Sequence, residues 1–319
     1  MFSFSQFVQS ILNEANEHNK AYGEAYELGT VLHVHDNTAA KSNKDASYQK
    51  KIKVMRARHR ELMSSLPADK AAKAHKAAQD SGHAYIESLA NNHGMDASKI
   101  HEVHHTHSGI DEHIGHEVSR SDNPHDLVVK GKKGKSNFLH GASLKARSGT
   151  ASNNGAGTID SHLGTNLMGK WKAHKDRAGL GNMSGKEIKA VRDKPEIVKK
   201  NQAAQNDVAN HHSSAFQSAD LKTQKEHLHR LLKGKPDMAY DYVSASNKGA
   251  KAIPHDKIEH LHAVKNAKSF STKVKNNVMH VYDHEGKHVA AIEHRPTHGS
   301  FSSLQVNAKY GSMKKGVEE

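Results

Sequence analysis

The sequence predicts a mixed α/β protein in which a central sheet is flanked by helices. Segments with helical spacing of apolar residues occupy the first third of the chain, and short alternating segments gather in its middle and at its end. Strands placed between and after helices in this way favour an α/β or α+β body with a mixed sheet. We treat residues 1–319 as a single domain with a helical insertion at 44–93 and a frayed tail at 312–319.

Helical patterns dominate the chain before residue 94. Residues 3–35 predict one or two helices whose large apolar side chains share roughly one face. Residues 44–93 predict two charged helices that are separated by Pro67, since proline disfavours helix at the residue before it. The second of these helices is rich in alanine and poor in large apolar residues, so we expect it to be largely solvated.

Strand patterns begin near residue 100. Alternating apolar residues predict a strand at 100–104, a hairpin at 126–145, a second hairpin at 278–293 and a final strand at 301–309. Helical patterns return at 185–233. Gly, Ser, Asn and Thr dominate residues 148–169, and we expect a long loop there.

Composition narrows the classes of partner. Lysine and arginine number 47 against 34 aspartates and glutamates, which gives a formal charge of +13. This surplus suits a polyanion, above all nucleic acid, although a basic surface also serves solubility alone. The absence of cysteine excludes disulfides and thiolate metal sites, and a reducing compartment such as the cytoplasm is expected. No apolar run is long enough to cross a membrane, so we expect no membrane partner.

The hairpin at 126–145 carries the residues that point to chemistry. Asp126 opens its first strand, and Gly131 and Gly134 lie in the turn. Ser143 and Lys145 share one face of the second strand, because side chains alternate along a strand. A carboxylate beside a lysine can hold a divalent cation and activate a water.

A magnesium site of this kind calls for a second carboxylate, because Mg²⁺ prefers oxygen ligands. Glu27, on the early helix, is the best candidate, and Glu24 and Glu102 are held in reserve.

A glutamate on an early helix, an aspartate that opens a strand and an x-x-Lys strand end together resemble the PD-(D/E)XK restriction-endonuclease-like nucleases. The resemblance covers residues 18–36 and 100–170, and the order of helix, hairpin and later helices matches that family's common core. It departs at two positions. Ser143 stands where an acidic residue is usual, and His125 replaces the proline that often precedes the aspartate.

The resemblance implies a restriction-endonuclease-like core and metal-dependent hydrolysis of DNA phosphodiester bonds, with Mg²⁺ or Mn²⁺ as cofactor. It implies that Glu27, Asp126 and Ser143 hold the metal and that Lys145 orients and activates the attacking water. Basic side chains beyond the hairpin are expected to contact phosphates: Arg147, Lys170, Lys172 and Lys309. A homodimer is compatible with this function. The first 15 residues resemble the N-terminal helix of many tailed-phage proteins, which suggests a host cytoplasm or a virion as location.

Two other functions stay open. The first is a non-catalytic basic DNA-binding or virion-associated protein that retains the fold, and Ser143 favours it. The second is a histidine-ligated metal enzyme, because imidazole is a common ligand of zinc and iron. The chain has 29 histidines, and the densest group comprises His101, His104, His105, His107, His113 and His116. The excess extends far beyond that group, so we expect most histidines on the surface, with His104 or His140 as a proton donor or phosphate contact beside Asp126.

Overall fold

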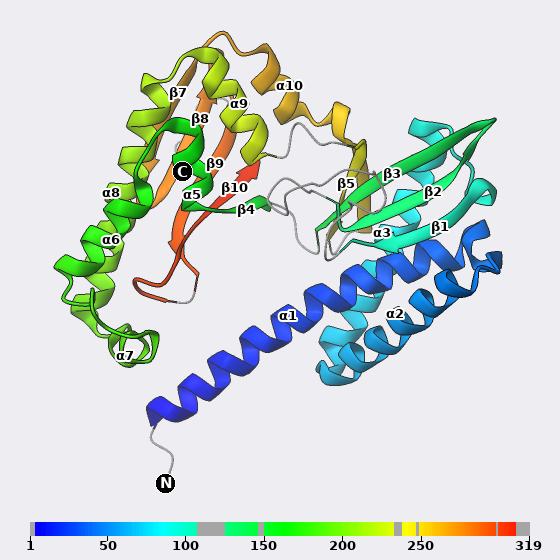
Figure 1. The fold of residues 1–319 in the computed structure, drawn as a ribbon, viewed down its shortest axis with the longest axis horizontal. Helices are drawn as coiled ribbons and strands as arrows, with labels where there is room; N and C mark the ends of the chain where they lie inside the picture. The colour runs from blue at the N-terminus through cyan, green and yellow to red at the C-terminus, as the bar shows by residue number, and fades with distance from the viewer. Residues whose placement is uncertain are drawn as a thin grey trace. The chain divides into compact units, whose positions relative to one another are not determined.

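The computed structural model describes residues 4–106, 125–145, 150–232, 238–246, 249–297 and 299–310, with the backbone alone at 4–17, 150–154 and 158. The mixed α/β class is confirmed (Figure 1). We expected one domain, whereas the contacts divide the chain into two compact units. The first unit comprises residues 1–148 and 236–255, and the second comprises 149–235 and 256–319.

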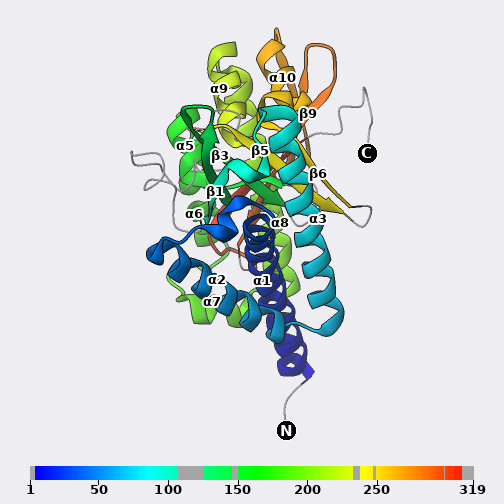
Figure 2. The same cartoon turned by 90° about the vertical axis from the view of Figure 1, so that its right-hand side faces the viewer.

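Three helices open the first unit: α1 (Phe4–Asp36), α2 (Ala46–Ser65) and α3 (Ala68–His93). Asp45 caps α2 by accepting a hydrogen bond from the Tyr48 N–H, and Pro67 separates α2 from α3. Helix α1 packs on α2 and α3, and α3 also covers strands β5 (Tyr240–Ser246) and β6 (Gly249–Pro254) (Figure 2). We expected residues 44–93 to be a helical insertion. They are part of the body of this unit, because α3 contributes to its core.

The sheet of the first unit has the order β1-β2-β3-β5-β6. Its first three strands, β1 (Ile100–His105), β2 (Leu127–Lys133) and β3 (Ser136–Lys145), form an antiparallel meander, which confirms the predicted strand at 100–104 and the predicted hairpin at 126–145. Strand β5 runs parallel to β3, and β6 pairs antiparallel with β5. Short 3-10 turns lie at Ala39–Ser42 and Ala97–Lys99, and a third, at His255–Lys257, spans the boundary between residue 255 of the first unit and residue 256 of the second.

The core of this unit lies between the helices and one face of the sheet. Leu127, Ala142 and Leu144 belong to one apolar cluster with residues of α1 and α3, such as Tyr26 and Leu89. Since side chains alternate along a strand, Ser143 and Lys145 face the other side of the sheet. The hairpin thus places its apolar residues in the core and leaves Lys145 at the strand end.

Close packing of α1 on α3 depends on Gly29. A Cβ atom at this position would lie 2.9 Å from the Ala78 Cβ, whereas a Cβ at Gly23 of the same helix would meet nothing within 4 Å. We expect Gly29→Ala to destabilise the protein by about 1–3 kcal/mol through overpacking. The control Gly23→Ala should stabilise it by about 0.5–1 kcal/mol, because alanine is the better helix former. Urea unfolding measures both, and equal effects would contradict this packing.

The second unit is built on the sheet β4-β10-β9-β8-β7. Its strands are β4 (Thr150–Gly155), β7 (Phe270–Lys275), β8 (Val278–Asp283), β9 (His288–Pro296) and β10 (Leu304–Tyr310). Its helices are α5 (Ala156–Leu163), α6 (Leu167–Arg177), α7 (Gly185–Val191), α8 (Pro195–Ser218), α9 (Leu221–Leu231) and α10 (Glu259–Asn266). Helix α8 packs on β7, β8 and β9, and every adjacent pair of strands is antiparallel.

The prediction of a long loop at 148–169 is wrong, because this segment contains β4, α5 and the start of α6. Strand β4 has no large apolar residue and lies at the edge of its sheet, where β10 is its one partner among the described strands. An edge strand of this composition carries no apolar alternation. Among the helices of the described residues, none combines the length and apolar character that a bilayer crossing requires.

Candidate active site

Asp126 and Lys145 meet at one end of the β2–β3 hairpin. The register pairs Leu127 with Ala142, which brings the residue before β2 beside the end of β3. The Lys145 Nζ lies 3.6 Å from the Asp126 Oδ2, and the Leu144 N–H donates to the same oxygen at 2.6 Å. The Lys145 side chain is 24% exposed and the Asp126 side chain is 27% exposed, so a ligand can reach the pair.

Glu27 joins this pair from α1. Its Oε2 lies 3.4 Å from the Nε2 of His105, the last residue of β1, and α1 packs against β1. The negative charge of Glu27 also raises the pKa of Asp126. We call Glu27, Asp126, Lys145 and His105 the hairpin site. His105 was noted only as one of a dense group of histidines, and no local spacing connects it with Glu27.

Opposing electrostatic effects act on Asp126 in the hairpin site. Burial raises the pKa of Asp126 above its usual value, and the nearby Glu27 charge adds to the shift. Lys145, the Leu144 N–H and His105 act in the opposite direction. The two carboxylates, with side chains 27% and 29% exposed, offer oxygen donors of the type that Mg²⁺ prefers.

Ser143 contributes to the hairpin site less directly than expected. It is only 4% exposed, and its backbone pairs with Tyr242 of β5. The accessible oxygen ligands of the site come from Glu27 and Asp126. A third carboxylate, which an acidic residue at this position would supply, is missing from the chain at this point of β3.

The reserve residues are engaged elsewhere. Glu24 accepts two hydrogen bonds from Arg58, at 2.8 and 3.0 Å. Glu102 lies 2.8 Å from the Nε2 of His104, and both line a polar pocket of about 160 Å³ with Lys130. His140 contacts the Tyr85 hydroxyl instead of lying beside Asp126.

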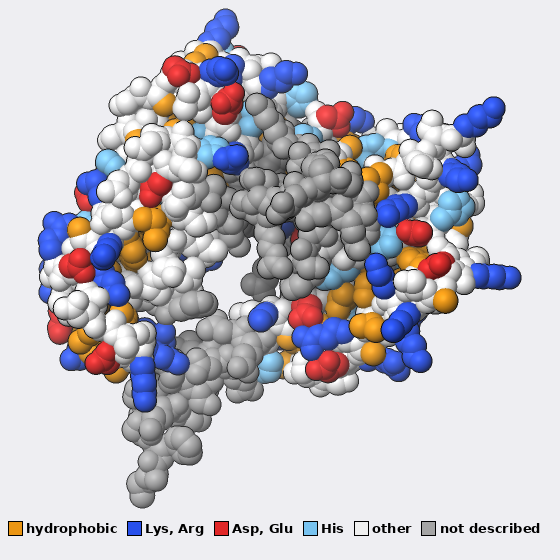
Figure 3. All heavy atoms as spheres, in the orientation of Figure 1, with side chains coloured by type: hydrophobic (Ala, Val, Ile, Leu, Met, Phe, Trp, Pro, Cys, Tyr) orange, Lys and Arg blue, Asp and Glu red, His pale blue; other side chains and the backbone are white. Residues whose placement is uncertain are grey.

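The expected phosphate contacts lie in the second unit, apart from Arg147, which falls outside the described residues. Lys170 and Lys172 are on α6 and Lys309 is on β10. The Lys170 Nζ is 3.7 Å from Asp207, and the Lys309 Nζ is 3.6 Å from Glu293. On the face drawn in Figure 3, Lys and Arg are spread over many elements and form no single stripe.

The electrostatics of the hairpin site predict a stabilising mutation. Because the folded environment disfavours the charged form of Asp126, Asp126→Asn should raise the free energy of unfolding at pH 7, by about 0.5–2 kcal/mol. The amide oxygen can still accept the Leu144 N–H. Thermal unfolding of both proteins checks this, and a lower midpoint for the variant would show that the ion pair with Lys145 outweighs burial and repulsion.

Comparison with known proteins gave no match. No family model matches it, and no curated protein is significantly similar in sequence.

Proposed function

We propose that this protein is a magnesium-dependent deoxyribonuclease whose chemistry takes place at the hairpin site. The observation that carries the proposal is that Asp126 and Lys145 meet at one end of the β2–β3 hairpin and that the charge of Glu27, from α1, acts on Asp126. Two carboxylates and a lysine are the donor set that metal-dependent phosphodiester hydrolysis needs. The formal charge of +13 suits a substrate with a phosphate backbone.

Each residue has a defined task in this proposal. Glu27 and Asp126 would hold Mg²⁺, which polarises the phosphate and lowers the pKa of a bound water. The Lys145 ammonium orients the water and stabilises charge that develops on the phosphoryl oxygens. The water oxygen forms a bond to phosphorus while the bond to the leaving oxygen breaks. The water gives up a proton to solvent, and the leaving oxygen takes one up.

A second function has its own support. Ser143 is buried where an acidic ligand is usual in the family that the hairpin resembles. With two carboxylates instead of three, the hairpin site can lack catalytic activity while the protein keeps its fold. A protein with a charge of +13 can still bind DNA through its phosphates. This candidate is a non-catalytic DNA-binding or virion-associated protein.

The two functions separate in one experiment. Purified protein is incubated with supercoiled plasmid in Mg²⁺, Mn²⁺ or EDTA, and binding to a labelled duplex is measured over a range of salt concentrations. Nicking or linearisation that requires a metal supports the nuclease. Binding that weakens steeply with salt, without cutting under any metal, supports the second candidate.

A further inference from the structure

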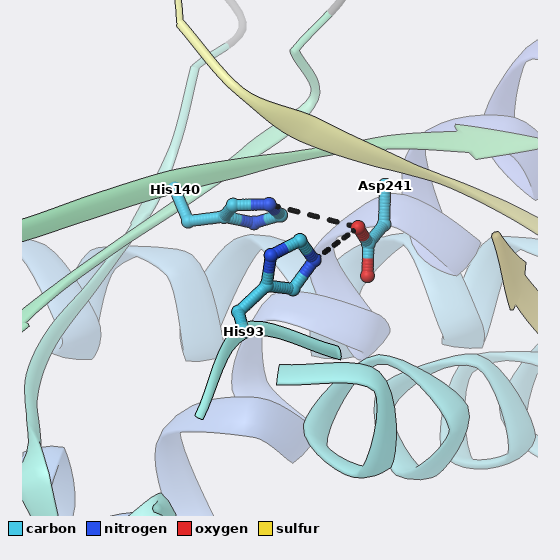
Figure 4. Close-up of side chains that lie close together, drawn as sticks. All are labelled: His93, His140 and Asp241. Atoms are coloured by element: carbon cyan, nitrogen blue, oxygen red, sulfur yellow. Dashed lines mark hydrogen bonds and ion pairs between the residues drawn. The ribbon is translucent and has the colours of Figure 1, made fainter. Parts of the chain in front are cut away.

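Two histidines and an aspartate meet inside the first unit, away from the hairpin site. His93 is the last residue of α3, His140 lies on β3, and Asp241 lies on β5 next to that strand. Figure 4 shows both imidazoles directed at the same carboxylate from different elements. His140 is five residues from Lys145, about 16 Å along the strand, and on the opposite face of the sheet.

The geometry of this cluster matches a metal site. The Asp241 Oδ1 lies 2.9 Å from the His93 Nε2 and 3.6 Å from the His140 Nε2, and the three ligand atoms lie within 4.8 Å of one another. Ligand atoms around a tetrahedral zinc ion are about 3.3 Å apart, given bond lengths near 2.0–2.1 Å. Small movements of these side chains would therefore complete a coordination sphere.

His140 is prepared to act as a ligand. Its side chain is 2% exposed, and its Nε2 makes no hydrogen bond with any described atom, since 3.6 Å is too long for one. Its Nδ1 lies 3.0 Å from the Tyr85 hydroxyl, which also lies 3.3 Å from the His140 carbonyl oxygen. When the hydroxyl donates to the carbonyl and accepts from Nδ1–H, the Nε2 lone pair points at the cluster. An outer hydrogen bond of this kind fixes the ring of a metal-bound histidine.

The surroundings favour a cation at this point. Asp241 is fully buried, and His93 is 20% exposed, which leaves a path from solvent. Tyr85 and Phe138 stack on the His140 ring and form an apolar shell.

We propose that His93, His140 and Asp241 bind a zinc ion. Two imidazoles and one carboxylate suit Zn²⁺, whereas Mg²⁺ prefers an octahedron of oxygens. Three protein ligands leave a fourth position for water on the side of His93. The ion would link α3, β3 and β5. Two of its ligands, His93 and Asp241, are 148 positions apart in the chain. The proposal does not depend on the nuclease function, because it uses none of the residues of the hairpin site.

The test uses the full chain stripped with EDTA and then titrated with Zn²⁺, by calorimetry and with Co²⁺ as a coloured substitute. We expect one tight equivalent in the wild type. His93→Gln should weaken zinc binding by at least about 100-fold. This threshold is the largest loss of metal affinity expected when a residue that only hydrogen-bonds to a ligand is removed. The control His101→Gln, which changes an exposed histidine of the same sheet, should bind as the wild type does. Other histidines bind weakly and equally in all three proteins.

Three results would overturn the proposal: a wild type without a tight equivalent, a His93→Gln protein that keeps it, or a zinc shell made of three or more imidazoles. Circular dichroism shows whether the variant is folded. X-ray absorption of the zinc-loaded wild type needs no variant, and there we expect scattering from two imidazoles and an oxygen ligand. A shell of three or more imidazoles would assign the ion to other histidines. Plasmid cutting in Mg²⁺ should be the same for wild type and His93→Gln, which keeps this test separate from that of the nuclease.

Discussion

Lys145→Ala should lower the rate of magnesium-dependent DNA cleavage by at least about 100-fold, since a positioned charge at a phosphoryl centre typically supplies that much. The Lys145 Nζ lies 3.6 Å from Asp126, at the open end of the hairpin, where it can reach both the water and the phosphate. DNA binding should change little, because one lysine among 47 basic residues adds little to the total phosphate attraction. Single-turnover cleavage and filter binding measure the two quantities.

Lys130→Ala is the matched control for this variant. Lys130 lies on β2 of the same sheet, is 36% exposed, and its Nζ is 3.9 Å from Glu102, a residue outside the hairpin site. Its removal should leave cleavage within about twofold of the wild type. Equal losses of cleavage rate in the two variants would show that Lys145 acts only as one basic residue among many. The central support for the nuclease function would then be gone.

The second unit should lose stability in weak acid. His212 of α8 lies between His227 of α9 and His294 of β9, with ring nitrogens 2.9 and 2.8 Å apart. All three are buried, and burial lowers the pKa of His227 to about 3, that of His294 to about 4, and that of His212 well below its usual value. Arg230 lies near His227 and its positive charge also opposes protonation, and His162 and His211 add to this effect when they are themselves protonated.

The direction of the pH dependence follows from proton uptake. The unfolded chain protonates these histidines below about pH 6.5, while the folded chain keeps them neutral. The unfolded state therefore binds more protons in the window between about pH 6.5 and 4. The stability contribution is complete above pH 6.5 and falls through that window by up to about 1.4 kcal/mol per pH unit for each histidine.

Urea unfolding at several pH values, followed by circular dichroism and amide exchange in α8 and β9, measures this loss. His212→Gln should flatten the slope, although it lowers stability at pH 7 because two buried partners lose a hydrogen bond. His284→Gln, a change at an exposed position of the β8–β9 turn, should keep the slope of the wild type. A stability that stays level from pH 7 to pH 4 would contradict the neutral state of this histidine chain.

The hairpin site was accessible from sequence because its parts are local. Asp126 and Lys145 lie in one hairpin, and Gly134 adopts the positive φ that its turn requires. Glu27 was selected because a magnesium site calls for a second carboxylate, and the resemblance to a nuclease family also implies a metal-binding glutamate on an early helix. His105 was missed as a partner of Glu27, since they are 78 residues apart and no spacing rule connects a helix with a distant strand.

The cluster of His93, His140 and Asp241 and the buried histidine chain could not be predicted in the same way. We expected most histidines on the surface, yet His140, His212 and His294 are buried. Each is accommodated by a partner from another element: Tyr85 for His140, and the histidine chain for the other two. Local composition carries no signal for such pairings, because burial of a histidine depends on which distant groups the fold brings to it.

The most direct test of the account is a double-mutant cycle of Asp126→Asn and Lys145→Ala, with plasmid cleavage measured in Mg²⁺. Residues that act as one site lose their effect together, so the double variant should be no slower than the slower single variant. Asp126→Asn is expected to stabilise the fold, which would exclude unfolding as the cause of its lost activity. Losses that multiply in the double variant, or cleavage that survives both changes, would show that Asp126 and Lys145 do not form one catalytic site.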